Sequence, residues 1–159
     1  MADESIRLLQ AQVEDSLVSI AEVYEHIENL KKQDPTSDRD IVLGYYLHVL
    51  YGLFENLFEQ IAAKFENNIA DKTQWHAQLL KRMTLNVKSI RPAVISRDSY
   101  VCLNELRRFR HLFRNAYLLK FDPDRLDIVL KHSDQLQSLY RTDFDNFLVF
   151  LEQLAQAET

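Results

Sequence analysis

Residues 41–54 read IVLGYYLHVLYGLF, an apolar run that His48 interrupts near its middle. A helix built from this run has almost no polar face, so other helices or another subunit must surround it. Gly44 and Gly52 lie on roughly one face of such a helix, where they allow a neighbouring helix to approach closely, at a cost of about 1 kcal/mol each relative to alanine. The run therefore predicts the central helix of a bundle and a first candidate for a dimer surface.

The composition of the chain supports an all-α fold. Its 159 residues include only two glycines and three prolines, which is too little turn chemistry for an all-β protein. The hydrophobic fraction of 47% is typical of a globular domain with a real core. Leu, Glu, Gln, Lys and Arg are frequent, and these residues favour helices. We expect a single domain over residues 1–159, folded as an up-and-down bundle of about five helices.

Start and stop signals place these helices along the chain. Asp34-Pro35 ends the first helix, because the residue before proline resists the helical conformation. Ser37 with Asp40 resembles a capping box for the second helix. Asp122 as N-cap and Pro123 at the first helical position begin the fifth. The expected helices cover residues 4–33, 38–67, 72–83 (capped by Asp71 and Gln74), from 96–99 to 117–120, and 123–157, with a loop that can hold a short turn over 84–96.

Charge and cysteine content exclude several classes of protein. The formal net charge of −5 shows that any nucleic-acid binding must come from a local basic patch rather than from the whole surface. The single cysteine, Cys102, excludes an internal disulfide, and its place on an apolar helical face predicts a core residue. The N-terminus does not resemble a signal peptide, and the run 41–54 is shorter than the ~20 residues of a membrane span. We expect a cytoplasmic protein with no membrane contact.

The sequence contains no motif that indicates a metal or cofactor. Glu22 and His26 come closest to the Glu-x-x-His pattern of di-metal bundles, but their spacing is wrong. No glycine-rich phosphate loop occurs. We therefore expect neither metal nor cofactor, and surface or core roles for four scattered histidines: His26, His48, His76 and His132.

Residues 106–117 read LRRFRHLFRNAY, with four arginines and one histidine in eight consecutive positions of an acidic chain. Apolar side chains recur every three or four positions, as a helix with one buried face requires. They are Cys102, Leu106, Phe109, Phe113 and Ala116. A cationic stripe on the other side can receive a phosphate. The plain alternative is a solvent-exposed helix face whose arginines pair with acidic residues of neighbouring helices.

The end of this basic stretch resembles a known motif. Arg110, followed after four residues by Asn115 and then by Tyr117, is similar to the R-x4-H-x-Y signature of HepT-like HEPN ribonuclease toxins, with asparagine in place of histidine. Trp75-His76 and Arg91-Pro92 also resemble a HepT-like subgroup, so the likeness spans most of the chain. The resemblance implies a metal-independent ribonuclease that acts as a homodimer. It also implies an antitoxin partner of the MNT nucleotidyltransferase type, which transfers AMP to the motif tyrosine, here Tyr117.

On this resemblance, Arg110 and Asn115 occupy the catalytic positions. An amide cannot exchange a proton near neutral pH, so we expect the chain to bind RNA but to cleave it poorly, since loss of a general base costs ~10²–10⁴-fold in rate. The asparagine is either natural or a deliberate change that silences a toxic protein. His111 is a weak substitute base, because it faces away from Tyr117. Three side chains of the stripe are expected to bind RNA phosphates: Arg107, His111 and Arg114.

A second hypothesis belongs to a different class of function. The chain could be a non-catalytic helical module that uses the basic stretch to bind a protein or a nucleotide. Tyr117 would then be an aromatic residue that covers the core at the end of its helix. The two hypotheses differ in their response to Asn115→His, which restores a proton-transfer group only in a ribonuclease.

Overall fold

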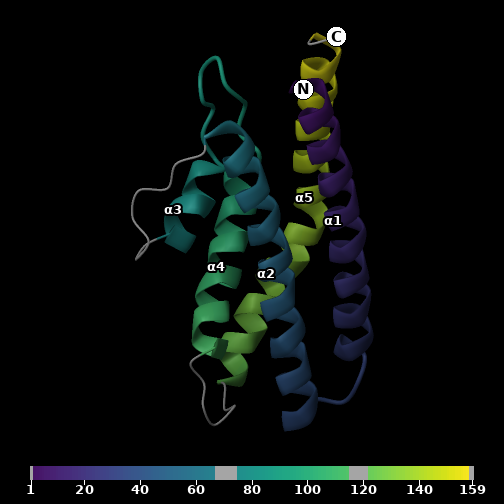
Figure 1. Ribbon diagram of the computed structural model, residues 1–159. Helices are drawn as coiled ribbons and strands as arrows, with labels where there is room; N and C mark the ends of the chain where they lie inside the picture. The colour runs from purple at the N-terminus through teal and green to yellow at the C-terminus, as the bar shows by residue number, and fades with distance from the viewer. Residues whose placement is uncertain (1, 67–74, 115–121, 158–159) are drawn as a thin grey trace.

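The computed structural model describes residues 2–66, 75–114 and 122–157. Within these ranges the chain forms five helices and no strand. The helices are α1 (Ala2–Lys31), α2 (Ser37–Phe65), α3 (Trp75–Arg82), α4 (Arg97–Arg114) and α5 (Pro123–Ala157). The predicted all-α class is confirmed. Figure 1 shows α1 beside α5 and α2 beside α4, with both termini at one end of the bundle and the short α3 on its outer side.

The helix α2 is the central element, as the apolar run predicted. It contacts each of the other four helices and buries side chains such as Leu47, Phe54 and Phe58 completely. Burial of one such side chain contributes roughly 1.5–3 kcal/mol relative to exposure. By length and composition α2 also meets the criterion for a membrane span, which core helices of water-soluble proteins meet too, and half of its most apolar window is buried inside the chain.

The packing between α1 and α5 closes the other side of the bundle. Tyr24 stacks on Tyr140 at 5.7 Å between ring centroids, and its hydroxyl donates to the Ser133 carbonyl at 2.9 Å. Burial raises the pKa of Tyr24 far above its usual range, so this phenol stays neutral. At the end of α1, Lys31 donates to Asp134 at 2.8 Å. These contacts hold two helices together whose residues are about a hundred positions apart in the chain.

Two of the predicted helix starts are confirmed. Asp122 is the N-cap of α5, since its carboxylate accepts from the amide of Asp124 at 3.0 Å. Ser96 has the same role for α4, with its hydroxyl accepting from the amide of Ser99 at 3.2 Å. The proposed caps Asp71 and Gln74 lie outside the described residues. Among the described residues of that expected helix, Trp75–Arg82 form α3.

The predicted cap of α2 is wrong. Thr36, one position before Ser37, keeps an extended backbone, and its hydroxyl accepts from the amide of Arg39 at 3.1 Å. The Thr36 carbonyl also accepts the first helical hydrogen bond, from the amide of Asp40 at 3.0 Å. Ser37 is already helical, so its side chain cannot take the capping position.

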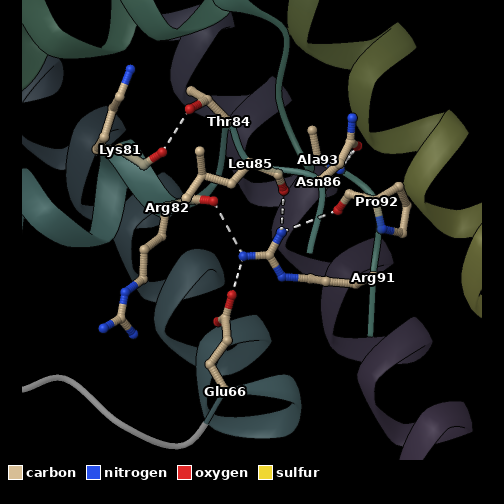
Figure 2. Close-up of polar contacts among 9 residues, drawn as sticks. All are labelled: Glu66, Lys81, Arg82, Thr84, Leu85, Asn86, Arg91, Pro92 and Ala93. Atoms are coloured by element: carbon tan, nitrogen blue, oxygen red, sulfur yellow. Dashed lines mark hydrogen bonds and ion pairs between the residues drawn. The ribbon is translucent and has the colours of Figure 1, made fainter. Parts of the chain in front are cut away.

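A buried arginine holds the connection between α3 and α4. The side chain of Arg91 is fully buried and forms an ion pair with Glu66, directly after α2. Its guanidinium also donates to the carbonyl oxygens of Arg82, Leu85 and Pro92, at 3.2, 3.0 and 3.1 Å. Figure 2 shows these acceptors arranged around the guanidinium. One side chain thus ties the end of α2 to the end of α3.

The loop over residues 83–96 contains the short turn that was expected. Val87 and Arg91 form an isolated antiparallel bridge, with the Val87 amide donating to the Arg91 carbonyl at 2.8 Å. Ser89, at the tip, has a φ of 65°, a left-handed conformation that is uncommon for residues other than glycine. The amide of Val94 donates to the Met83 carbonyl at 2.8 Å, which returns the chain to the end of α3.

Candidate functional site

The helix α4 presents its basic side to solvent, as the spacing predicted. Cys102, Leu106 and Phe109 are buried, and Phe113 packs against the core. Arg108, His111 and Arg114 are exposed, whereas Arg107 and Arg110 are half-buried. The described part of α4 ends at Arg114, so Asn115 and Tyr117 lie outside the described residues.

A pocket of about 350 Å³ lies between α2, α3 and α4. The four basic residues predicted from the sequence line it together, and two residues of α2 and one residue of α3 complete it. The lining residues are Tyr51, Glu55, His76, Arg107, Arg110, His111 and Arg114. Three arginines face one carboxylate, so the pocket is cationic although the whole chain is acidic.

The buried carboxylate of Glu55 joins the two sides of this pocket. Glu55 is only 5% exposed. One of its oxygens accepts from Nδ1 of His76 at 2.8 Å, and the other accepts from Nη1 of Arg110 at 3.4 Å. A buried carboxylate costs several kcal/mol unless it is paired. The two contacts offset that cost and bring α3 and α4 to the same point of α2.

The orientation of the Arg110 side chain depends on a glycine of α2. A Cβ atom placed on Gly52 would lie 3.6 Å from Nη1 of Arg110, so the guanidinium rests on the backbone of α2 at this position. Gly52 was expected to let another helix approach closely. What approaches α2 at Gly52 is the guanidinium of Arg110, a side chain of α4. Nε of Arg110 is buried without a hydrogen-bond partner among the described residues, so donor capacity remains beyond the contact with Glu55.

The hydroxyl of Tyr51 adds a buried polar group to the wall of the pocket. Tyr51 is 1% exposed, and its hydroxyl has no hydrogen-bond partner among the described residues. An unsatisfied buried hydroxyl costs about 1–3 kcal/mol. Burial first, and then the negative charge of Glu55, raise the pKa of Tyr51 well above its usual range. This phenol therefore stays neutral.

The remaining arginines lie along one side of α4. Arg107 is held by Asn104, one turn earlier, through two hydrogen bonds of 3.1 and 2.9 Å. Arg114 lies exposed at the end of the described helix. On α2, His48 packs against Phe113 in a tilted arrangement, with 5.4 Å between the ring centroids. Burial, followed by the charges of Arg110 and Arg114, lowers the pKa of His48, which reflects the positive potential of this region.

The structure supports parts of both interpretations of the basic stretch. Arg110 pairs with an acidic residue of a neighbouring helix, as the plain alternative expected, and Arg108 pairs with Glu105 on its own helix at 3.5 Å. Arg107, Arg110, His111 and Arg114 nevertheless share one concave pocket. Their roles in RNA binding and catalysis stay predictions.

Three pocket residues, Tyr51, Glu55 and His76, were not identified as site residues from the sequence. His76 was assigned a surface or core role, and Glu55 was not considered. A signal for Glu55 existed: it follows Tyr51 by four positions and lies among residues of α2 that are buried. An acid on a buried helical face must find a partner. The sequence does not show which partner, because His76 and Arg110 are 21 and 55 positions away.

Within the described ranges, no group of three or more His, Cys, Asp or Glu side chains is arranged to hold a metal ion.

Comparison with known proteins adds one finding. The family model described as HepT-like protein matches residues 42–151, which is more than half of the chain. These residues run from the first turns of α2 into the last part of α5 and include the whole pocket. No curated protein and no solved structure matches the chain.

Proposed function

Because the chain belongs to the HepT-like family, we propose that it is the toxin of a toxin–antitoxin pair and a metal-independent endoribonuclease. One observation carries this proposal: three arginines and two histidines converge on a pocket in a chain of net charge −5. Such a pocket attracts a polyanion to one place on the surface. Arginine suits the task because its guanidinium stays charged and matches phosphate oxygens with two parallel donors.

The proposed reaction uses the 2′-hydroxyl that distinguishes RNA from DNA. The 2′-oxygen attacks the adjacent phosphorus, and negative charge develops on the non-bridging phosphate oxygens. Arg110 stabilises that charge with the donors that Glu55 does not use, while Arg107 and Arg114 hold the flanking phosphates. Asn115 stands where the family has histidine. Because an amide does not transfer protons at neutral pH, the rate of the unsubstituted chain with Asn115, called the natural chain below whatever the origin of Asn115, is low in this scheme.

The proposal includes two partners. A second copy of the chain places its basic stretch opposite the first and completes a cleft for RNA; Val42 and Tyr45 remain exposed on α2, the helix predicted to carry the dimer surface. Light scattering at micromolar concentration should therefore give a dimer. The other partner is an MNT-type nucleotidyltransferase antitoxin that transfers AMP to Tyr117. The added phosphate competes with RNA for Arg110 and Arg114 and so neutralises the toxin.

The test is the substitution Asn115→His. We expect this variant to cleave RNA at least ~100-fold faster than the natural chain and to arrest the growth of cells that express it. Arg110→Ala in the same background should abolish both effects. Arg108→Ala is the matched control, because Arg108 lies on α4 but does not line the pocket.

A folded Asn115→His protein that is harmless and leaves RNA intact would contradict the proposal. In that case the second hypothesis, a non-catalytic interaction module, gains support. It gains more if charge reversal at Arg110 and Arg114 leaves partner binding unchanged.

A further inference from the structure

His76 has the local environment of a proton acceptor. A carboxylate offers no proton, so Nδ1 of His76 donates to Glu55 in the 2.8 Å hydrogen bond. In the neutral ring the other nitrogen, Nε2, is then an acceptor. The side chain of His76 is 51% exposed and lines the pocket, while the side chain of its partner Glu55 is buried. The ring is thus fixed from the buried side and accessible from the pocket.

We propose that His76 is the general base of this pocket and that Glu55 is its positioning residue. The inference rests on the proposed function, since it assigns a proton acceptor to the cleavage of RNA. It supplies the group that Asn115 cannot provide. It also places this group on α3, outside the basic stretch.

The geometry brings the base and the phosphate-binding cation to one carboxylate. His76 and Arg110 bind the two oxygens of Glu55, at 2.8 and 3.4 Å. A phosphate that contacts the unused donors of Arg110 therefore lies in the same pocket as Nε2 of His76. Because Glu55 is buried, its position is set by the packing of α2, and it aligns both side chains before a substrate arrives.

The other histidines near the pocket are less suited to this role. His48 does not line the pocket, its Nδ1 is buried without a hydrogen-bond partner among the described residues, and its lowered pKa opposes proton uptake. His111 lines the pocket from α4, together with Arg107 and Arg114, whereas His76 lines it from α3. The imidazolium formed at His76 is stabilised by Glu55.

The proposed step balances as follows. Nε2 of His76 takes the proton of the 2′-hydroxyl while the 2′-oxygen forms a bond to phosphorus. The bond between phosphorus and the 5′-oxygen breaks, and the departing oxygen takes a proton from water. The hydroxide that remains accepts the proton of the imidazolium, which restores His76. The products are a 2′,3′-cyclic phosphate and a 5′-hydroxyl end.

The experiment measures single-turnover cleavage of a fluorescent single-stranded RNA between pH 5 and 9. The variants are His76→Gln and Glu55→Gln, each in the natural chain and in the Asn115→His background. His26→Gln is the matched control, because His26 stacks on Tyr46 and does not line the pocket. Fluorescence anisotropy with the same RNA separates binding from cleavage, and thermal unfolding confirms that each variant is folded.

We expect His76→Gln to lower the cleavage rate by about 100-fold or more in the natural chain and to leave the RNA dissociation constant within about threefold. The loss of rate on the acid side of the profile, where an imidazole base becomes protonated, should disappear. Imidazole added to His76→Ala should restore part of the rate. Glu55→Gln should lower the rate with little effect on binding, because an amide holds the ring less firmly.

The outcomes separate this inference from the proposed function. If Asn115→His cleaves RNA and the natural chain does not, or if His76→Gln cleaves as fast as its parent with the same pH profile, the role of His76 is overturned and the ribonuclease assignment stands. If no folded variant, including Asn115→His, cleaves RNA, the proposed function itself fails. Equal losses of rate and binding in His76→Gln would reduce this residue to a phosphate contact and would also overturn the inference.

Discussion

At the scale of single residues, the pocket concentrates unusual electrostatics in a small space. Glu55 is buried and paired, Tyr51 is buried and neutral, and His48 has a lowered pKa beside Arg110 and Arg114. Each of these features has a cost for folding, either in desolvation or in repulsion between like charges. Costs of this kind gather where a protein uses its side chains, so they support the proposal that this pocket is the functional site.

The lowered pKa of His48 predicts a loss of stability in acid. Above pH 6.5, the usual pKa of the ring, His48 is neutral in both states and does not contribute. Below that pH the unfolded chain takes up the proton first, so the free energy of unfolding falls until the folded ring also titrates. Urea unfolding at pH 8, 6 and 5 should show a weaker acid dependence for His48→Phe than for the natural chain.

A second variant identifies the cause of this pH effect. Arg114→Gln removes one of the two charges that disfavour the imidazolium and should also weaken the dependence. Identical slopes for the natural chain and His48→Phe would show that the ring does not contribute to it.

The basic side of the pocket could be predicted from the sequence, but its acidic centre could not. Arg107, Arg110 and Arg114 belong to one helix, and helical geometry alone places them together. The contact of Glu55 with His76 requires the packing of α2 against α3. No local sequence pattern predicts such a contact. The sequence indicates that a buried acid needs a partner, but it does not indicate which residue that partner is.

At the scale of the helices, local chemistry explains most of the observed starts. Asp122 and Ser96 cap α5 and α4 as their residue types indicate. The sequence did not determine whether Thr36 or Ser37 caps α2. Both residue types can cap a helix, and each has a backbone amide three positions later that its hydroxyl could accept from. Backbone geometry decided it: Thr36 keeps the extended conformation after Pro35, and Ser37 is the first helical residue.

This difference leads to a prediction for α2. Thr36→Ala removes the hydroxyl that accepts from the Arg39 amide and should lower the free energy of unfolding by about 1 kcal/mol. Ser37→Ala is the control, and it should be neutral or slightly stabilising because alanine favours the helix interior. Chemical unfolding of both variants under the same conditions measures the two changes in the free energy of unfolding. A larger loss for Ser37→Ala than for Thr36→Ala would return the cap to Ser37.

At the scale of the whole molecule, the pocket depends on helices that different contacts hold in place. The matched family region, residues 42–151, excludes α1, but α1 packs against α2 and α5 and buries a full apolar seam that includes Leu9, Val13 and Leu17. The short α3 has fewer residues to anchor it. Arg91 compensates for this, because it binds Glu66 next to α2 and the carbonyl of Arg82 in α3.

Substitution of Arg91 should therefore affect both stability and the pocket. Arg91→Met removes the partner of Glu66 and the guanidinium that donates to the carbonyl groups of Leu85 and Pro92, and loss of one member of a buried ion pair costs about 3–5 kcal/mol. Lys88→Met, on the exposed tip of the same loop, should change stability by less than about 0.5 kcal/mol. Urea unfolding measures both changes.

The effect of Arg91→Met on RNA cleavage shows whether Arg91 also positions His76 in the pocket, beyond its effect on the stability of the fold. At a temperature where Arg91→Met remains folded, α3 is less firmly held, and a smaller fraction of molecules keeps the contact between His76 and Glu55. RNA cleavage should then fall at least about tenfold, whereas RNA binding, which depends on the arginines of α4, should change little. Equal stability of Arg91→Met and Lys88→Met would contradict the structural role of Arg91. An unchanged cleavage rate in a destabilised Arg91→Met protein would show that the pocket does not need this anchor.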